Sequence, residues 1–212
     1  MLKLPIIFKK LKIKKLKMSL VSIETLIEGA ISGNLVSFPT DTVPALGALP
    51  QKADLIFQAK RRSPDKPLIL MGATPESLWP YVRGSDEELQ LWQEVAQKYW
   101  PGPLTLVLPA SEIVPGEMNP FDPTTIGIRI PNCDIAREIM AQTGPLATTS
   151  ANFSGQPPLG RMAEINAQFP DVLVLSHEQE IILASGVPST VAKWKEISCW
   201  EILRQGAVKL KF

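Results

Sequence analysis

Apolar residues recur at helical spacing in several stretches of the chain, and this pattern predicts amphipathic helices. Residues that can cap a helix precede some of these stretches, and Gly or Pro follows others, as after Ile31 and Trp100. We expect helices over residues 22–31, 52–61, 85–99, 133–142 and 161–168.

Short apolar runs between these stretches are typical of buried β-strands. We expect strands over residues 35–38, 67–71, 104–108, 126–130, 173–175 and 189–192. The mixture of helices and strands predicts an α/β fold. The strand at 35–38 runs directly into Thr40 and Asp41, at the kind of strand end where ligands of α/β sheets gather.

The composition is that of a globular protein. The chain has 212 residues, of which 45% are hydrophobic and 20% charged, and its 20 prolines are spread throughout rather than gathered in a linker. No internal repeat interrupts the chain. We therefore expect a single domain over residues 18–212.

Charge is unevenly distributed along the chain. Seven lysines fall within residues 1–17, so a formal net charge of +1 leaves about −6 for the remainder. This stretch lacks the apolar run and cleavage site of a signal peptide. We interpret it as a flexible extension; an electrostatic arm for RNA or an anionic membrane surface is the alternative.

Several classes of chemistry are excluded by what the sequence lacks. Cys133, Cys199 and His177 have no metal-ligand spacing, and there is no phosphate loop, GxGxxG or nucleophile elbow. No apolar run approaches the length of a membrane helix. Scarce cysteines without a secretion signal favour a cytoplasmic location.

A cationic loop, Lys60-Arg-Arg-Ser-Pro-Asp-Lys66, precedes the predicted strand at 67–71. Guanidinium groups bind phosphate oxygens in pairs, and lysine adds a mobile charge, so the loop is suited to gripping a polyphosphate. A solvated surface loop explains the same residues equally well.

Hydroxyl groups are concentrated in one further segment. Thr148, Thr149, Ser150, Asn152 and Ser154 lie within seven positions and can direct donors at an anion. Taken alone, a serine-rich turn that caps a helix is the simpler interpretation.

Arg129 lies within the apolar strand at 126–130, where a buried cation requires an anionic partner. That partner is either the carboxylate of a substrate or an internal Asp or Glu. Arg204 follows Ile202-Leu203 in a similar pattern near the end of the chain.

Taken together, these segments resemble the YrdC-like family of threonylcarbamoyl-AMP synthases, in its short single-domain form, from about Ser22 to about Ala207. Five motifs carry the resemblance: Phe-Pro-Thr-Asp-Thr-Val at 38–43, Lys60-x-Arg62, Trp100-Pro-Gly-Pro-Leu-Thr-Leu, Arg129-Ile-Pro131, and Ser150-Ala-Asn-x-Ser-Gly155. They appear in the order that the family has.

The resemblance implies a twisted mixed open α/β sheet, flanked by helices, with a deep central cavity that has a basic rim. It also implies that bicarbonate carboxylates the amine of L-threonine and that the carbamate attacks the α-phosphorus of ATP. The product would pass to a separate tRNA threonylcarbamoyl transferase, with a possible weak tRNA contact. Because no protein nucleophile is required, the lack of a catalytic triad agrees with this reaction.

Site residues follow from the same resemblance. ATP would be held by Lys60, Arg62, Lys66, Thr148, Ser150, Asn152 and Arg204, with Lys60 and Arg62 as catalytic residues. Threonine would be held by Thr40, Arg129 and Ser189. Mg²⁺ would arrive with ATP, without a dedicated protein cage.

Three departures from the family's pattern bear on substrate choice. Pro44 and Ala45 replace the usual aromatic and glycine residues, Met71 replaces a histidine found in many long relatives, and Lys66 replaces an asparagine. Two alternatives remain: a non-enzymatic module that binds double-stranded RNA or tRNA, and a paralogue that adenylates another carbamoyl compound.

Overall fold

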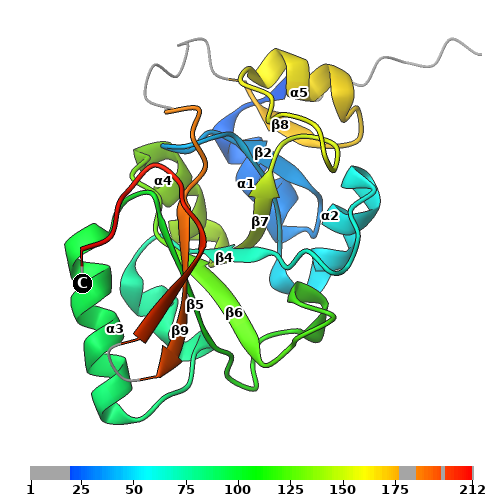
Figure 1. The fold of residues 1–212 in the computed structure, drawn as a ribbon. Coiled ribbons are helices and arrows are strands. Elements are labelled where there is room, and N and C mark those ends of the chain that lie inside the picture. The colour runs from blue at the N-terminus through cyan, green and yellow to red at the C-terminus, as the bar shows by residue number, and fades with distance from the viewer. Residues whose placement is uncertain (1–19, 177–184, 197–198, 212) are drawn as a thin grey trace, which may run out of the picture.

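The computed structural model describes residues 20–176, 185–196 and 199–211. One mixed β-sheet forms the centre of this part of the chain. Within these residues the sheet has ten strands in the order β1-β8-β2-β3-β7-β4-β6-β5-β9-β10 (Figure 1). Their bounds are Leu20–Val21 (β1), Val36–Phe38 (β2), Ala45–Ala48 (β3), Ile69–Met71 (β4), Leu104–Pro109 (β5), Thr125–Arg129 (β6), Leu146–Ser150 (β7), Leu173–Leu175 (β8), Thr190–Glu196 (β9) and Cys199–Arg204 (β10). The predicted mixed open sheet is confirmed.

Five α-helices flank this sheet in the described residues: α1 (Ile23–Ile31), α2 (Ala53–Lys60), α3 (Asp86–Tyr99), α4 (Asp134–Thr143) and α5 (Met162–Gln168). Each predicted helix is present, and no bound differs by more than one residue. Short 3-10 helices connect the elements: η1 (Pro50–Lys52), η2 (Pro75–Ser77), η3 (Trp79–Tyr81) and η4 (Gly116–Met118).

Local capping explains why the first and third helices begin where they do. The Ser22 side chain accepts a hydrogen bond from the Thr25 amide at 3.3 Å. Ser85 and Glu88 form a capping box, in which each side chain accepts from the other residue's amide. Both devices satisfy amides that a helix leaves without a partner in its first turn.

The sequence pattern did not predict strands β1, β3, β7 and β10. Strand β7 covers Leu146–Ser150, so the interpretation of residues 148–150 as part of a serine-rich turn is wrong. Thr148 pairs with Gly47 of β3 on one side and with Ile69 of β4 on the other. Strong pairing on both sides makes a strand of hydroxyl-rich residues that resemble a turn when they are considered alone.

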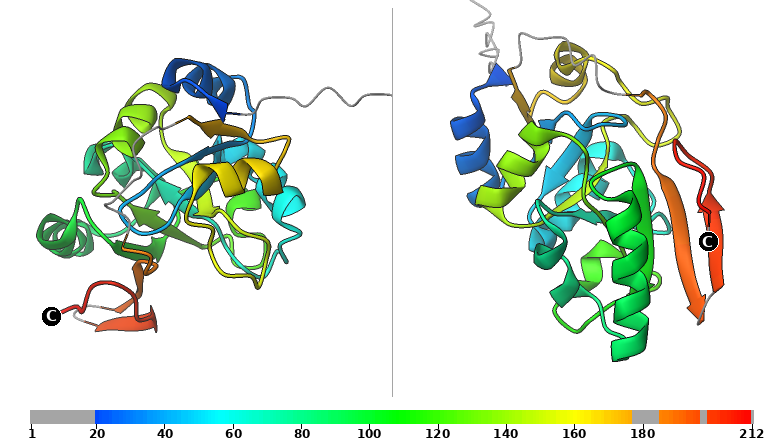
Figure 2. Two further views of the ribbon diagram at one scale, coloured as in Figure 1. Left: turned by 90° about the horizontal axis from the view of Figure 1, so that it is seen from above. Right: turned by 90° about the vertical axis from the view of Figure 1, so that its left-hand side faces the viewer.

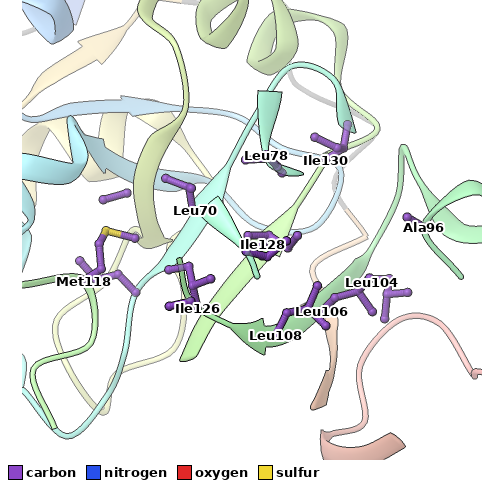
Figure 3. Packing of buried hydrophobic residues seen from close by; sticks show 14 of the residues in the cluster. Leu70, Leu78, Ala96, Leu104, Leu106, Leu108, Met118, Ile126, Ile128 and Ile130 are labelled. Carbon is purple, nitrogen blue, oxygen red and sulfur yellow. The ribbon is translucent and has the colours of Figure 1, made fainter. Parts of the chain in front are cut away.

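The strands at the centre of the sheet have one core face and one polar face, because successive side chains in a strand point to opposite sides. On the core face, Leu70, Leu106 and Ile128 pack in one cluster (Figure 3), which α3 joins through Trp92. The opposite face of β5 and β6 carries Thr105, Val107, Thr125, Gly127 and Arg129.

Aromatic contacts fix the hairpin of β9 and β10 beside α3, where Figure 2 shows it at one side of the molecule. Trp194 packs edge-on against Trp92 with ring centroids 5.8 Å apart, and against Trp200 at 5.1 Å. The Trp194 indole also donates to the Glu88 carboxylate at 3.1 Å. This anchoring determines where Leu203 and Arg204, at the end of β10, are held.

Two sequence-based interpretations, the flexible extension and the lack of metal-ligand spacing at His177, involve residues that the structure does not describe. The basic stretch at 1–17 and His177 lie outside the described residues. Within the described part of the chain, no helix has the length and apolar character needed to cross a membrane.

Candidate functional site

A cavity of about 420 Å³ lies on the polar face of the central strands. Residues of β7 and alternate residues of β4, β5, β6 and β9 form its floor, and the loops that precede β3, β4 and β6 contribute to its edge. A concave site with a few convergent polar groups is the usual form of a small-molecule binding site.

Six of the ten predicted site residues line this cavity: Arg62, Arg129, Thr148, Ser150, Ser189 and Arg204. They come from positions far apart in the sequence, and the sheet brings them together. The other four, Thr40, Lys60, Lys66 and Asn152, do not line it; three of these are buried just behind its wall, and Lys66 is exposed.

Three guanidinium groups converge on the cavity. Burial lowers the pKa of Arg62, Arg129 and Arg204, and in Arg62 and Arg129 the positive charge of Arg204 lowers it further. Carboxylates oppose this effect: Asp65 raises the pKa of Arg62, and Asp41 raises that of Arg129. Mutual repulsion among cations in one cavity favours the binding of an anion there.

Two of these arginines are oriented by the main chain. Arg62 donates from Nε to the Lys66 carbonyl at 3.0 Å and from Nη2 to the Pro67 carbonyl at 3.1 Å. Arg204 donates to the carbonyl and hydroxyl oxygens of Ser189 at 3.0 and 3.1 Å. Both guanidinium groups are thus held in fixed positions and keep further N–H donors for a ligand.

Arg129 has an internal carboxylate partner. Its Nη2 donates to Asp41 Oδ1 at 2.6 Å, its Nη1 to Thr42 Oγ1 at 3.0 Å, and its Nε to the Gly102 carbonyl at 3.1 Å. The sequence left a substrate carboxylate and an internal acid as alternatives, and in this structure the acid is Asp41. A guanidinium has five N–H donors, so two remain for a bound carboxylate.

Thr40 supports the turn beside this ion pair. Its hydroxyl donates to the Val43 carbonyl at 2.7 Å and accepts from the Thr42 amide at 3.2 Å. Thr40 is buried, whereas Thr42 lines the cavity. A contact between Thr40 and threonine therefore stays a prediction, and Thr42 is the hydroxyl that faces the cavity at this end.

Lys60 ties the end of α2 to the end of β7. Its ammonium group donates to the Ser150 carbonyl, to the Asn152 carbonyl at 2.6 Å and to Asn152 Oδ1 at 3.3 Å. Burial, and secondarily the charge of Arg62, lowers the pKa of Lys60 to about 7. The amide of Asn152 in turn donates to the carbonyls of Phe153 and Gln156, at 2.9 and 2.6 Å.

Sequence reasoning missed part of the cavity lining. Thr105 bonds the Ser189 hydroxyl at 2.9 Å, and a further group lies at the edge near β6 and β9: Asn119, Phe121, Asp122, Thr125 and Lys193. Period-two alternation from Arg129 through Gly127 to Thr125 was the signal that would have identified Thr125. The loop before β6 has no periodicity, so nothing in the pattern indicated Asn119 or Phe121.

Acidic, histidine and cysteine side chains are not clustered in the described part of the chain. No group of three or more His, Cys, Asp or Glu side chains is placed to hold a metal ion in that part of the chain. The expectation that Mg²⁺ arrives with the nucleotide stays a prediction.

Fold and site together define an α/β protein with a cavity on the polar face of its sheet, lined by three arginines and several hydroxyl groups. A family model described as "Telomere recombination", for the Sua5/YciO/YrdC domain, matches residues 30–206. The chain therefore belongs to the Sua5/YciO/YrdC family, as the motifs in its sequence predicted.

Relatives of known name support this assignment. A threonylcarbamoyl-AMP synthase of Vibrio campbellii is 32% identical over 191 residues, which cover 86% of this chain and 98% of the relative. One of Pyrococcus abyssi is 43% identical over 129 residues, but these cover 59% of this chain and only 37% of that protein.

Solved structures agree with the fold. The structure of P. abyssi Sua5 complexed with L-threonine has a TM-score of 0.73 and 34% identity, with 87% of this chain and 54% of that chain covered. The match to Escherichia coli YciO has a TM-score of 0.74 and 21% identity, and it covers 89% of this chain and 91% of the YciO chain. At this identity the likeness shows the shared fold alone. This chain thus spans about half of the Pyrococcus structure.

Proposed function

We propose that this protein is an L-threonylcarbamoyladenylate synthase, which forms threonylcarbamoyl-AMP and pyrophosphate from L-threonine, bicarbonate and ATP. The observation that carries the proposal is the convergence of Arg62, Arg129 and Arg204 on one cavity that hydroxyl groups also line. Relatives that bear the synthase name over nearly their whole length support it.

The cationic groups suit a reaction between two anions. A carbamate and a triphosphate repel one another in water, and arginine forks bind phosphate and carboxylate oxygens in pairs. Positioned guanidinium groups also stabilise charge that develops on the α-phosphoryl oxygens during transfer. Arg62 and Arg204 are the proposed phosphate ligands, and Arg129 the proposed carboxylate ligand.

Some of the other predicted residues are placed to contact the substrates, and others hold the structure around the cavity. Thr148, Ser150 and Ser189 line the cavity and offer hydroxyls to the substrates. Lys60 and Asn152 hold the turn after β7, which positions Ser150. Phosphate contact by Lys60, Lys66 or Asn152 requires a movement of those side chains toward the cavity, since none of them lines it.

No protein nucleophile is needed for this chemistry. The carbamate oxygen displaces pyrophosphate from the α-phosphorus, so binding energy is used to bring two substrates together and to stabilise charge. Mg²⁺ carried by ATP, mainly on phosphate oxygens and water, would neutralise part of the triphosphate charge. Transfer of the product to tRNA by a second enzyme, and a cytoplasmic location, belong to the same proposal.

The decisive experiment measures pyrophosphate release by the full chain supplied with ATP and Mg²⁺. Threonine and bicarbonate are present together, and each is then omitted in turn. We expect release only when both are present. Release that ignores threonine contradicts the synthase and favours the paralogue that adenylates another carbamoyl compound.

A non-enzymatic RNA-binding module is the second alternative, and salt separates it from the synthase. A protein that binds the phosphate backbone loses affinity steeply as salt rises. Folded protein that binds tRNA in this way and releases no pyrophosphate under any substrate combination would contradict the proposed function.

A further inference from the structure

Arg204 lies at an exposed place for a ligand-binding side chain, because it is the last residue of an edge strand. Within the described residues β10 pairs only with β9, and this pairing is irregular between Ile202 and Arg204. The guanidinium donates to the Ser189 carbonyl at 3.0 Å and to the Ser189 hydroxyl at 3.1 Å. The end of a strand with one neighbour frays easily, so the contacts that follow Arg204 in the chain decide how firmly it is held.

The segment that follows β10, residues 205–211, turns back across the start of β9 and reaches the end of α3 (Figure 1). We call it the return segment. Near its start, the Ala207 amide donates to the Pro188 carbonyl at 3.0 Å. At its far end, the Lys211 amide donates to the Tyr99 hydroxyl at 3.0 Å. Both ends of the return segment are thus attached to the body of the fold.

One buried hydroxyl joins the return segment to β9. Thr190, the first residue of β9, is fully buried. Its Oγ1 donates to the Val208 carbonyl at 2.5 Å, and it accepts from the Gly206 amide at 2.9 Å and from Gln205 Nε2 at 3.4 Å. A threonine hydroxyl has one donor and two acceptor positions, so all three are used inside the protein. Thr190 therefore has no position left for a ligand, although its neighbour Ser189 lines the cavity.

The return segment lies in close contact with the main chain just before β9. A Cβ atom at Gly206 would overlap the main chain of Pro188 and Ser189. Gly206 follows Arg204 by two residues, which span at most about 7 Å of chain. A bond that fixes the Gly206 amide therefore also limits the movement of the Arg204 main chain.

We propose that Thr190 is a positioning residue, which holds Arg204 in place for the nucleotide through the return segment. The inference rests on the proposed use of ATP and on Arg204 as a phosphate ligand. Loss of the Thr190 hydroxyl would leave the Gly206 amide and the Val208 carbonyl without this partner and would loosen the chain after Arg204. Bound ATP would then have to order the arginine, which lowers affinity.

Thr190→Val tests the role of the hydroxyl, because it removes that group and keeps much the same side-chain shape. Calorimetric titration of the full chain with ATP should show about fivefold weaker binding by this variant. Thr190→Ser, which keeps the hydroxyl, should bind ATP within about twofold of the wild type. In assays of pyrophosphate release, Thr190→Val should raise the ATP concentration needed more than the threonine concentration needed.

A double-mutant cycle with Arg204→Gln separates positioning from a merely structural role. If Thr190 acts through Arg204, Thr190→Val should change ATP affinity by less than about twofold once Arg204 is already replaced. An equal loss of affinity in both backgrounds overturns the proposal. Wild-type affinity for ATP in a folded Thr190→Val protein overturns it as well.

Gln205→Ala decides the matter if Thr190→Val does not fold, because Gln205 is exposed and its Nε2 bonds Thr190, Gly206 and Val208. We expect about twofold to threefold weaker ATP binding, and no further effect in the Arg204→Gln background. Gln90→Ala is the matched control, since Gln90 is an exposed glutamine of α3 that bonds Glu94.

Unchanged ATP affinity in Gln205→Ala, together with an unfolded Thr190→Val, overturns the positioning role. Failure of the wild-type protein to bind ATP at all contradicts the proposed function instead. The two failures are therefore distinguishable, since the first is seen only in variants and the second already in the wild type.

Discussion

Asp41 and Arg129 form a buried ion pair in which Oδ1 and Nη2 are 2.6 Å apart, although the residues are 88 positions apart in the chain. Their side chains are 11% and 3% exposed. Such a pair adds little net stability compared with apolar residues, yet loss of one member leaves a buried charge uncompensated.

Asp41→Asn should therefore destabilise the protein by about 3–5 kcal/mol, measured by urea unfolding. Asp134→Asn is the control, because Asp134 also pairs with an arginine, Arg137, but its side chain is 94% exposed. We expect that control to change stability by less than about 1 kcal/mol. Equal effects of the two substitutions would show that burial of the Asp41 pair has no energetic consequence.

Arg129→Ala should raise the threonine concentration needed for half-maximal pyrophosphate release more than the ATP concentration needed. The reason is that Arg129, the proposed carboxylate ligand, keeps two N–H donors beyond its bonds to Asp41, Thr42 and Gly102. A variant in which only the ATP requirement rises would place the phosphates, not the threonine carboxylate, at Arg129.

Arg62→Gln should weaken ATP binding about tenfold, since it removes a charged donor pair that the Lys66 and Pro67 carbonyls hold in place. Titration calorimetry at fixed ionic strength measures this change. Arg83→Gln serves as a control, because Arg83 is exposed and does not line the cavity. If both variants lost the same affinity for ATP, Arg62 would act only through general electrostatic attraction and not through direct contact with the phosphates.

Lys60 should make stability depend on pH in an unusual window. Its pKa is about 7 in the folded protein, below the ordinary lysine value of 10.5, so the unfolded chain binds more protons between these values. The stability of the wild type relative to Lys60→Met should therefore rise as pH increases from about 7 toward 10.5. Below pH 7 the lysine is protonated in both states, and the cost of burying its charge is fully present.

Urea unfolding of the wild type and of Lys60→Met at about pH 6.5 and about pH 9.5 measures this difference. The first pH lies below the pKa of Lys60 in the folded protein, and the second lies above it. Lys52→Met is the matched control, since Lys52 is exposed at the start of the same helix. A pH-independent difference between the wild type and Lys60→Met would mean that Lys60 keeps its charge throughout.

Gly127→Val should block the cavity while leaving the fold intact. A Cβ at Gly127 would lie 3.4 Å from Thr105 Cγ2 and 3.6 Å from Ile69 Cγ1, which is ordinary van der Waals contact. The branched side chain would then project from the middle of the cavity floor. We expect a melting temperature near that of the wild type and loss of ATP binding; unchanged affinity would mean that the nucleotide lies elsewhere.

Regular periodicity made much of this fold predictable. The helix over 85–99 has a capping serine, a clear apolar stripe and a terminating Trp100-Pro-Gly-Pro, and the structure confirms it to within a residue. Strand β3, with the sequence Ala-Leu-Gly-Ala, has too few β-branched residues to indicate a strand, and forms through pairing with β2 and β7.

The candidate site was predictable where a residue type conflicted with its surroundings. Arg129 in an apolar strand required an anion, but its partner Asp41 was fixed only by the tertiary fold. Lys60 was singled out for its charge, and nothing local indicated that its ammonium group would be buried against the carbonyls of residues 150 and 152. Phe121 lies in a loop without periodicity, so its place at the cavity edge was not predictable.

The clustering of Arg62, Arg129 and Arg204 has a consequence for the end of the catalytic cycle. Pyrophosphate leaves the α-phosphorus with its own negative charges intact, and the guanidinium groups that attract a triphosphate attract it as well. Departure of this product restores the repulsion among the arginines, which makes release energetically uphill. Release of pyrophosphate would then limit the turnover rate of the proposed synthase, and free pyrophosphate would act as a product inhibitor.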